Sequence, residues 1–282
     1  RLLPAHLAKM EAVFPKVPNM KQLNKRPHLL PAIGERKKRA AFFSGCLMDT
    51  LFLDTNMATI ELLRLAGCEI IIPEQQTCCG ALHGHSGEKS EAILLAKRNI
   101  QAFEDSNADF IITNAGGCGA FLKEYDHLLK DDSEWRERAA SFTGKLKDFS
   151  SVLLELNFDQ QSLELPEQIV TYQDSCHLRN VMKTSTEPRR LIRSIKGIEF
   201  KEMKNAESCC GSAGIYNIVE SEMSMKILDT KMEAAAATRA ATIVTANPGC
   251  LLQMKLGIER AGLTDRVRAV HLADLLLEAV QK

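Results

Sequence analysis

A pattern of cysteines occurs twice along this 282-residue chain and constrains its fold more than any other feature. Each copy consists of a single cysteine, a Cys-Cys-Gly triplet and a further single cysteine. The gap before the cysteine pair is 31 residues in the first copy and 32 in the second, and the gap after the pair is 38 and 39 residues. The eight cysteines of the pattern are Cys46, Cys78, Cys79, Cys118, Cys176, Cys209, Cys210 and Cys250. Because both gaps agree to within one residue, we predict a duplicated unit of about 130 residues.

The sequence around the cysteines repeats as well. Thr113–Cys118 corresponds to Thr245–Cys250, and Phe149–Glu155 corresponds to His271–Glu278. Two copies are too few for a solenoid, in which each repeat packs only against its neighbours. We therefore expect two halves that pack around a pseudo-twofold axis.

The repeat also predicts how the chain is divided. We expect one half at residues 38–160 and the other at residues 161–282. Residues 1–37 are interpreted as a leader that connects the first half to a missing N-terminal region. The chain begins without Met, and it lacks the basic-then-apolar order of a signal peptide.

Composition and charge exclude several classes of protein. No apolar run approaches the ~18–20 residues that span a bilayer. Lys plus Arg and Asp plus Glu each number 36, so the net charge favours neither nucleic acid nor an anionic membrane surface. We expect no transmembrane segment, no nucleic-acid partner and a cytoplasmic location. In a reducing compartment, patterned cysteines bind metals or take part in catalysis more often than they form disulfides.

Short β-branched runs alternate with segments of helical spacing, which is typical of an α/β fold with parallel strands and right-handed crossovers. The expected strands are Ala40–Ser44, Glu69–Ile72, Phe110–Thr113, Ile169–Gln173, Ile198–Lys201 and Thr242–Thr245. The expected helices are Met57–Leu65, Gly87–Phe103, Glu220–Ala240 and two that begin soon after Cys118 and Cys250. The prediction is an α/β protein with two repeated parallel-sheet halves.

Each single cysteine and each triplet follows an expected strand. In a parallel sheet the loops after the strands emerge at one edge, so four cysteines that are far apart in the sequence can converge there. Four thiolates suit zinc in a tetrahedral site or an iron–sulfur cluster. Gly80 and Gly211 follow the cysteine pairs, and glycine lets the backbone approach a bound group closely. We predict one four-cysteine metal site at the carboxyl edge of each sheet, with these glycines beside the bound group.

Other interpretations stay open at this point. Buried cysteines can act as small hydrophobic residues, and an oxidising compartment would permit disulfides. For Cys68, which lies outside the repeat, we expect the hydrophobic role. His83, His85 and His177 lie close to patterned cysteines and could be ligands, hydrogen-bond partners of a sulfur or polar loop residues. The sequence contains no recognisable nucleophile–base set, so no catalytic residue is predicted.

The duplicated pattern resembles the cysteine-rich CCG domain family over roughly residues 38–282. That family includes the cysteine-rich subunit of heterodisulfide reductase, lactate-utilisation protein A and the iron–sulfur subunits of glycolate oxidases. The segments most similar to the last of these are Phe43–Cys46, Asn114–Gly119, Asp174–Leu178 and, in the leader, Leu2–Pro31.

The resemblance also bears on the cofactor. The heterodisulfide reductase pattern has a further cysteine three positions before the last one, where this chain has Ala115 and Asn247. Each half thus has four candidate ligands. The resemblance implies iron–sulfur clusters of the [4Fe–4S] type, with zinc as a possibility in one half.

By the same resemblance, the chain would be an electron-transfer subunit of a glycolate oxidase complex that does not itself touch the substrate. A separate flavoprotein subunit would oxidise glycolate, and this subunit would pass the electrons towards a membrane acceptor such as a quinone. It would then lie in the cytoplasm, at the inner face of the membrane through its partners. The alternatives are a lactate-utilisation iron–sulfur protein, a zinc-binding structural module and a thiol–disulfide enzyme similar to heterodisulfide reductase.

Overall fold

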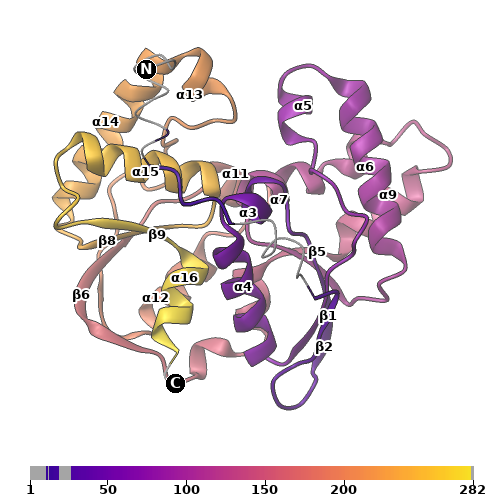
Figure 1. Ribbon diagram of the computed structural model, residues 1–282, viewed down its shortest axis with the longest axis horizontal. Coiled ribbons are helices and arrows are strands. Elements are labelled where there is room, and N and C mark those ends of the chain that lie inside the picture. Colours follow the sequence, from indigo (N-terminus) through magenta and orange to yellow (C-terminus); the bar gives the residue numbers. More distant parts are fainter. Residues whose placement is uncertain (1–10, 12, 19–26, 281–282) are drawn as a thin grey trace.

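The computed structural model describes residues 11, 13–18 and 27–280, and this part of the chain contains one β-sheet in each half (Figure 1). Residues 1–10, 12 and 19–26 of the expected leader lie outside the described residues, as do residues 281–282 of the second half.

The first sheet has the strand order β1-β3-β2-β4-β5. Its strands are β1 (Leu29–Leu30), β2 (Lys38–Phe42), β3 (Cys68–Ile71), β4 (Phe110–Thr113) and β5 (Leu146–Asp148). The helices of this half are α3 (Leu47–Thr50), α4 (Leu53–Leu65), α5 (Ala81–His85), α6 (Lys89–Glu104), α7 (Gly116–Lys123), α8 (Tyr125–Leu128), α9 (Arg136–Lys145), α10 (Phe149–Glu155) and the 3-10 helix η1 (Phe158–Gln160). Strands β2 to β5 pair in parallel, as predicted, and the short β1 adds an antiparallel edge.

The second sheet has the order β7-β6-β8-β9, and all of its pairs are parallel. Its strands are β6 (Glu164–Tyr172), β7 (Lys196–Phe200), β8 (Thr242–Thr245) and β9 (Arg268–His271). Its helices are α11 (Cys176–Asn180), α12 (Thr186–Arg193), α13 (Tyr216–Val219), α14 (Ser221–Ala237), α15 (Pro248–Arg260) and α16 (Leu272–Ala279). This order matches β3-β2-β4-β5 strand for strand, which confirms the predicted pair of repeated parallel-sheet halves.

The central strands of the two sheets show why these segments form strands. Every residue of β4, Phe-Ile-Ile-Thr, is buried, and so is every residue of its counterpart β8, Thr-Ile-Val-Thr. Strands of a parallel sheet are covered by helices on both faces, so they read as continuous β-branched and apolar runs. The sequence located both strands correctly for this reason.

The structure corrects several expected helix bounds, among them the starts of three helices. The helix expected from Gly87 begins at Lys89, because Gly87 has a φ of +85° and ends the turn after α5. The helices expected after Cys118 and Cys250 begin two residues before each of them, at Gly116 and Pro248.

The repeat near the end of each half is also shifted by one residue. His271 is the last residue of β9 and caps α16, so its structural counterpart is Asp148, which ends β5 and caps α10. The expected partner of His271, Phe149, is instead the first residue of α10 and corresponds to Leu272.

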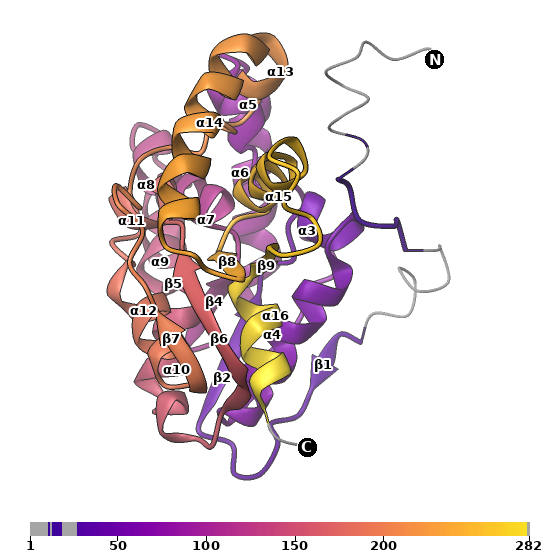
Figure 2. The same ribbon diagram turned by 90° about the vertical axis from the view of Figure 1, so that its left-hand side faces the viewer.

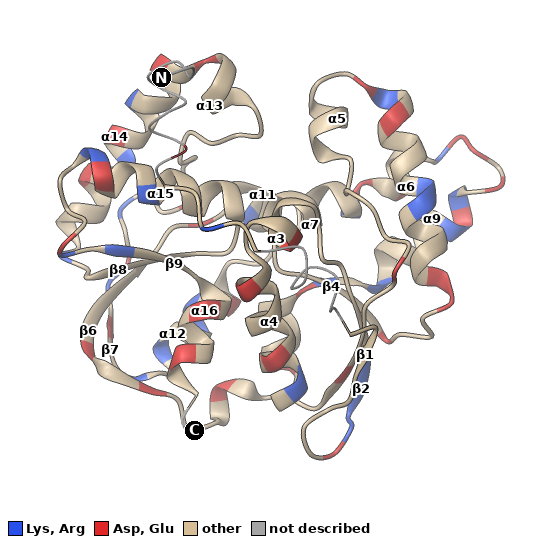
Figure 3. Ribbon diagram, viewed as in Figure 1, with Lys and Arg blue, Asp and Glu red and all other residues tan. Residues whose placement is uncertain are grey.

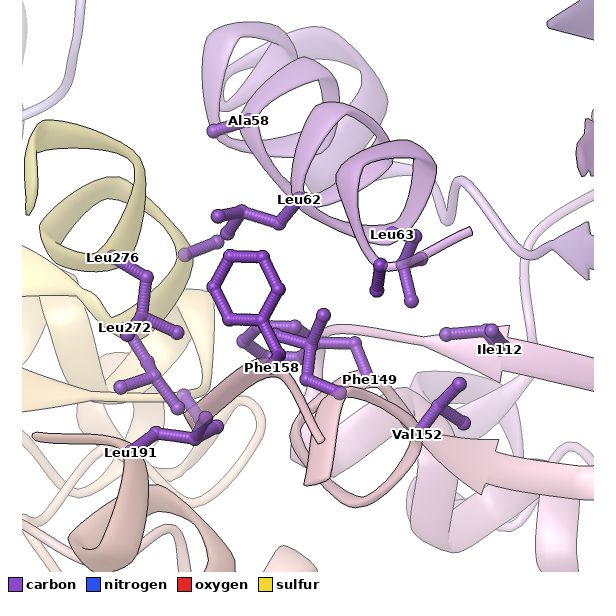
Figure 4. Close-up of a cluster of buried hydrophobic side chains, with 14 of the residues drawn as sticks. Ala58, Leu62, Leu63, Ile112, Phe149, Val152, Phe158, Leu191, Leu272 and Leu276 are labelled. Atoms are coloured by element: carbon purple, nitrogen blue, oxygen red, sulfur yellow. The ribbon is translucent and has the colours of Figure 1, made fainter. Parts of the chain in front are cut away.

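A shared hydrophobic core joins the halves. The C-terminal helix α16 packs on α4 of the first half, and the two helices lie side by side in Figure 2. Figure 4 shows Phe158 between Leu62 of α4 and Leu276 of α16. Phe158 is fully buried, as are most side chains around it. The two sheets are therefore held together by one continuous core, which fixes the position of their carboxyl edges relative to each other.

None of the helices in the described ranges is both long and apolar enough to cross a membrane.

Candidate metal centres

The loops at the carboxyl ends of the strands bring the patterned cysteines of both halves to one place. All eight of them line a single cavity of about 160 Å³. Each lies in the segment after a strand: Cys46 after β2, Cys78 and Cys79 after β3, Cys118 after β4, Cys176 after β6, Cys209 and Cys210 after β7, and Cys250 after β8. All nine cysteines of the chain, each within the described residues, are free thiols. The structure thus brings cysteines from both halves of the chain together around one cavity.

Within the first set the sulfur atoms form a connected series. Cys46 and Cys79 each hydrogen-bond to Cys78, and Cys79 is also hydrogen-bonded to Cys118. The hydrogen bonds from Cys46 and Cys79, together with a backbone N–H, hold the pKa of the Cys78 thiol well below its usual range. The Cys78 thiol is thereby favoured in its deprotonated form, the form that binds metals.

The second set repeats this series residue by residue. Cys176 and Cys210 hydrogen-bond to Cys209 and lower its pKa, and Cys210 is also hydrogen-bonded to Cys250. The hydrogen bond with Cys210 lowers the pKa of Cys250 as well, although burial of Cys250 opposes this effect. The duplication in sequence is therefore also a duplication of side-chain contacts.

Gly80 and Gly211 give each cysteine pair its backbone shape. Their φ angles are +86° and +92°, in the left-handed region that favours glycine. In this conformation the N–H of Gly80 lies 3.5 Å from the Cys78 sulfur, and the N–H of Gly211 lies 3.3 Å from the Cys209 sulfur. Each glycine thus directs an N–H to the first sulfur of its pair.

The first turns of α7 and α11 join the two sets of cysteines. Gly116 opens α7 so close to α11 that a Cβ at this position would lie 2.5 Å from the Ser175 hydroxyl. Its N–H donates to the Ala246 carbonyl oxygen at 3.1 Å. Cys118 and Cys250 are each the third residue of their helix, where the positive end of the helix dipole favours a thiolate.

A buried polar network fixes the segment before Cys118. The Asn114 amide donates to Asn56 Oδ1 at 2.9 Å and to Thr59 Oγ1 at 2.8 Å. His271 Nε2 lies 2.9 Å from the Asn114 carbonyl oxygen, and His271 Nδ1 accepts from the Ala273 N–H. The neutral imidazole thereby ties the second half to the loop that precedes Cys118 in the first.

The three histidines singled out in the sequence take different positions. His85 lines the cavity from the first half, and its ring centre lies 5.7 Å from that of His177 in the second half. His177 Nδ1 is 3.6 Å from the Cys176 sulfur, and burial followed by the charge of His85 lowers its pKa. The buried Nδ1 of His83 has no hydrogen-bond partner among the described residues.

Cys68 lies apart from both sets. It is the first residue of β3, it is fully buried among aliphatic side chains, and burial raises its pKa to about 12. Its counterpart in the second half is Ile198, and each follows a glycine with positive φ, Gly67 or Gly197. A cysteine that replaces isoleucine in the repeat acts as a small hydrophobic residue.

We expect Cys68→Ser to leave bound iron and labile sulfide unchanged while it lowers the free energy of unfolding by about 1–2 kcal/mol, because a hydroxyl would be buried among apolar side chains. Metal analysis and urea unfolding of the variant measure the two effects. Loss of metal from this variant would show that Cys68 belongs to a ligand set.

The residues at the cavity fit a group that is held by thiolates. Each set offers four free thiols, one of them with a strongly lowered pKa, and a backbone N–H directed at a sulfur. Bound clusters are held by cysteine thiolates and tuned by such N–H contacts. Among the described residues, no group of three or more His, Cys, Asp or Glu side chains is placed to hold a single metal ion.

Comparison with known families agrees with this donor set. Residues 40–123 and 170–255 match the cysteine-rich domain family, CCG, and contain all eight patterned cysteines. The chain belongs to this cysteine-rich domain family, which confirms the resemblance seen in the sequence.

Individual relatives narrow the comparison. The chain is 72% identical over 280 residues to a probable glycolate oxidase iron–sulfur subunit from Bacillus subtilis, and the match covers 99% of the chain and 63% of that protein. It is 34% identical over 239 residues to lactate utilization protein A from Geobacillus thermodenitrificans, covering 84% of the chain and 98% of that protein. The chain thus spans less than two thirds of the length of the Bacillus subtilis relative.

A solved structure has the same fold. A hypothetical protein from Helicobacter pylori superposes with a TM-score of 0.64 at 10% sequence identity, covering 100% of this chain and 55% of that one. At this level of identity the likeness concerns the fold alone.

Proposed function

We propose that this chain is the cluster-binding part of an iron–sulfur electron-transfer subunit of a glycolate oxidase complex. The observation that carries the proposal is the convergence of eight free thiols, in two equivalent sets of four, on one cavity. The name and the 72% identity of the Bacillus subtilis relative support the assignment to glycolate oxidase. The four thiols of each set are proposed as the ligands, and Gly80 and Gly211 are proposed to lie beside the bound group.

The chemistry of the ligands supports a redox role. A bound [4Fe–4S] cluster would accept and release single electrons. The protein would hold it with thiolates, surround it with fixed N–H groups and keep it close to a second centre across the shared cavity. No residue of the chain is proposed to act on the substrate. A flavoprotein subunit is proposed as the electron donor and a membrane quinone as the final acceptor, which would place the complex at the cytoplasmic face of the membrane.

Iron and acid-labile sulfide analysis of anaerobically purified protein tests the cofactor. We expect iron and sulfide in similar amounts, whereas zinc without sulfide would contradict the proposal and favour a structural module.

A glycolate-dependent dye-reduction assay tests the subunit role. The chain alone is expected to be inactive. Activity should require the flavoprotein partner, because that partner is proposed to oxidise glycolate. Glycolate oxidation by the isolated chain would overturn the electron-transfer assignment. Lactate as the preferred donor of the assembled complex would favour the lactate-utilisation alternative.

A further inference from the structure

The duplication allows the surroundings of the two cysteine sets to be compared residue by residue. From α6 to α7 in the first half, and from α14 to α15 in the second, equivalent residues differ by 132 in number. This offset aligns Cys118 with Cys250 and the φ-positive Asn107 with Arg239. Differences at equivalent positions are therefore differences between two otherwise similar sites.

The first difference lies three residues before the last cysteine of each set. The first half has Ala115, which offers no side-chain donor, and the second half has Asn247. Asn247 Nδ2 lies 3.5 Å from the Cys250 sulfur, within reach of a hydrogen bond to it, and Asn247 Oδ1 accepts from the Gly117 N–H at 2.9 Å. The contact with Gly117, in the other half, orients the amide so that its N–H₂ group faces the sulfur.

The second difference is a charge. Asn99 of α6 is buried and neutral, and its amide contacts the Cys78 carbonyl oxygen. At the equivalent position α14 has Lys231, which is 2% exposed. Its ammonium donates to the carbonyl oxygens of Asn205 and Ala206, shortly before the second cysteine pair.

The side chains that pack against Gly80 and Gly211 are also more polar in the second half. Ala92 and Phe121 stand against Gly80 in the first half, where Ser224 and Gln253 stand against Gly211 in the second. The Gln253 amide donates to the Ser224 hydroxyl, which in turn donates to the Gly211 carbonyl oxygen. The side chains against Gly80 are thus apolar, whereas those against Gly211 are polar. Figure 3 also shows that α5 and α13 carry no Lys, Arg, Asp or Glu.

The negative charge near the second cysteine set does not cancel the positive charge of Lys231. Asp174 is buried two residues before Cys176, but Arg189 binds both of its oxygens at 2.9 and 2.8 Å, and Arg179 adds a third contact at 3.2 Å. Lys231 forms no ion pair among the described residues; burial lowers its pKa, whereas the charges of Glu207 and Asp174 raise it.

We propose that Asn247 and Lys231 make the second cysteine set hold its redox centre at a more positive reduction potential than the first set. Hydrogen bonds to cysteine sulfurs and nearby positive charge both stabilise the reduced, more negative form of a cluster. The inference rests on the proposed iron–sulfur function and concerns the order of the two centres. Neither residue is proposed as a ligand, so both are positioning residues.

Redox titration of the anaerobically purified complex, followed by electron paramagnetic resonance, tests the proposal. Cys46→Ser and Cys176→Ser assign each signal to its half. In the unsubstituted protein the signal of the second half should appear at the more positive potential. Asn247→Asp keeps the acceptor for the Gly117 N–H but removes the donor to Cys250 and adds negative charge, so it should shift only the second signal to a more negative potential. Asn247→Ala should shift it in the same direction by less.

Lys231→Met provides an independent variant, with Lys226→Met as its control. Lys226 is an exposed residue of the same helix, so its replacement removes the same charge from the surface. Lys231→Met should lower the potential of the second centre alone, and Lys226→Met should leave both potentials in place. Equal potentials in the unsubstituted protein, or an unmoved second signal in Asn247→Asp, would overturn the inference. Absence of bound iron would instead overturn the proposed function on which it rests.

Discussion

Replacement of Cys209 and Cys210 by serine is expected to remove about half of the bound iron and labile sulfide, and to stop electron transfer to the final acceptor. These residues supply the two central sulfurs of the second set, and both neighbouring cysteines are hydrogen-bonded to them. A serine hydroxyl is a harder and far less acidic donor than a thiol, so it does not replace a thiolate in an iron–sulfur site.

The split between two activities makes this variant informative. The assembled complex should still reduce its flavin with glycolate, because the proposed ligands hold the redox centre and do not act on the substrate. Transfer to a quinone analogue should be lost. Iron analysis, stopped-flow flavin absorbance and quinone reduction measure the three outcomes. The mirror variant, with serine at 78 and 79, should lose the other half of the iron, and Cys68→Ser is the matched control with an intact repeat.

Normal quinone reduction by the double variant at positions 209 and 210 would contradict the ligand role. So would an unchanged iron content in both double variants.

The cysteine spacing predicted much of the site, because it reports on strand topology. Residues that follow parallel strands meet at one edge whatever the length of the helices between them. The spacing alone could therefore predict that Cys46 and Cys118 approach each other. It could not predict that both sets face the same cavity, since this depends on how α16 packs on α4.

Short strands with mixed composition were beyond the sequence-based prediction. β5 consists of Leu-Lys-Asp and β9 of Arg-Ala-Val-His, and neither shows the continuous apolar run of β4 or β8. Both lie at a sheet edge, where fewer neighbours require apolar residues.

Lys231, which distinguishes the second site from the first, was missed for a related reason. Lys231 reads as an exposed position of a helix, although it is buried. The neutral Asn99 is recognised as the counterpart of Lys231 only when α6 and α14 are aligned as equivalent helices of the repeat.

A second large effect is expected from Asp148→Asn, which should stabilise the protein more as the pH rises. Asp148 is fully buried at the end of β5, and burial raises its pKa from 3.8 to about 7. Its Oδ1 accepts hydrogen bonds from the N–H and hydroxyl of Ser150, at the start of α10, whereas Oδ2 has no partner among the described residues. Ionisation of this carboxyl in the folded protein is therefore unfavourable.

The sign follows from the two pKa values. Below 3.8 the carboxyl is protonated in both the folded and the unfolded chain, so its ionisation costs nothing. Between 3.8 and about 7 the folded protein binds the extra proton, so the free energy of unfolding falls as the pH rises. Above about 7 the loss is complete and amounts to about 4 kcal/mol.

His271, the structural counterpart of Asp148, has the opposite pH dependence. Burial lowers its pKa from 6.5 to about 4, so the stability that depends on its neutral form is lost as the pH falls below 6.5.

Asparagine keeps the acceptor for Ser150 and cannot ionise. Its stabilising effect should therefore grow by about 2–3 kcal/mol between about pH 5 and about pH 8, as measured by urea unfolding under reducing, anaerobic conditions. Asp265→Asn, at an exposed turn before β9, removes the same charge at the surface and should change the stability little at either pH. Burial also raises the pKa of Asp274 to about 6, so the free energy of unfolding of the variant should still fall somewhat as the pH rises. A stabilisation by Asp148→Asn that is equal at both pH values would show that Asp148 is already ionised in the folded protein at the lower pH.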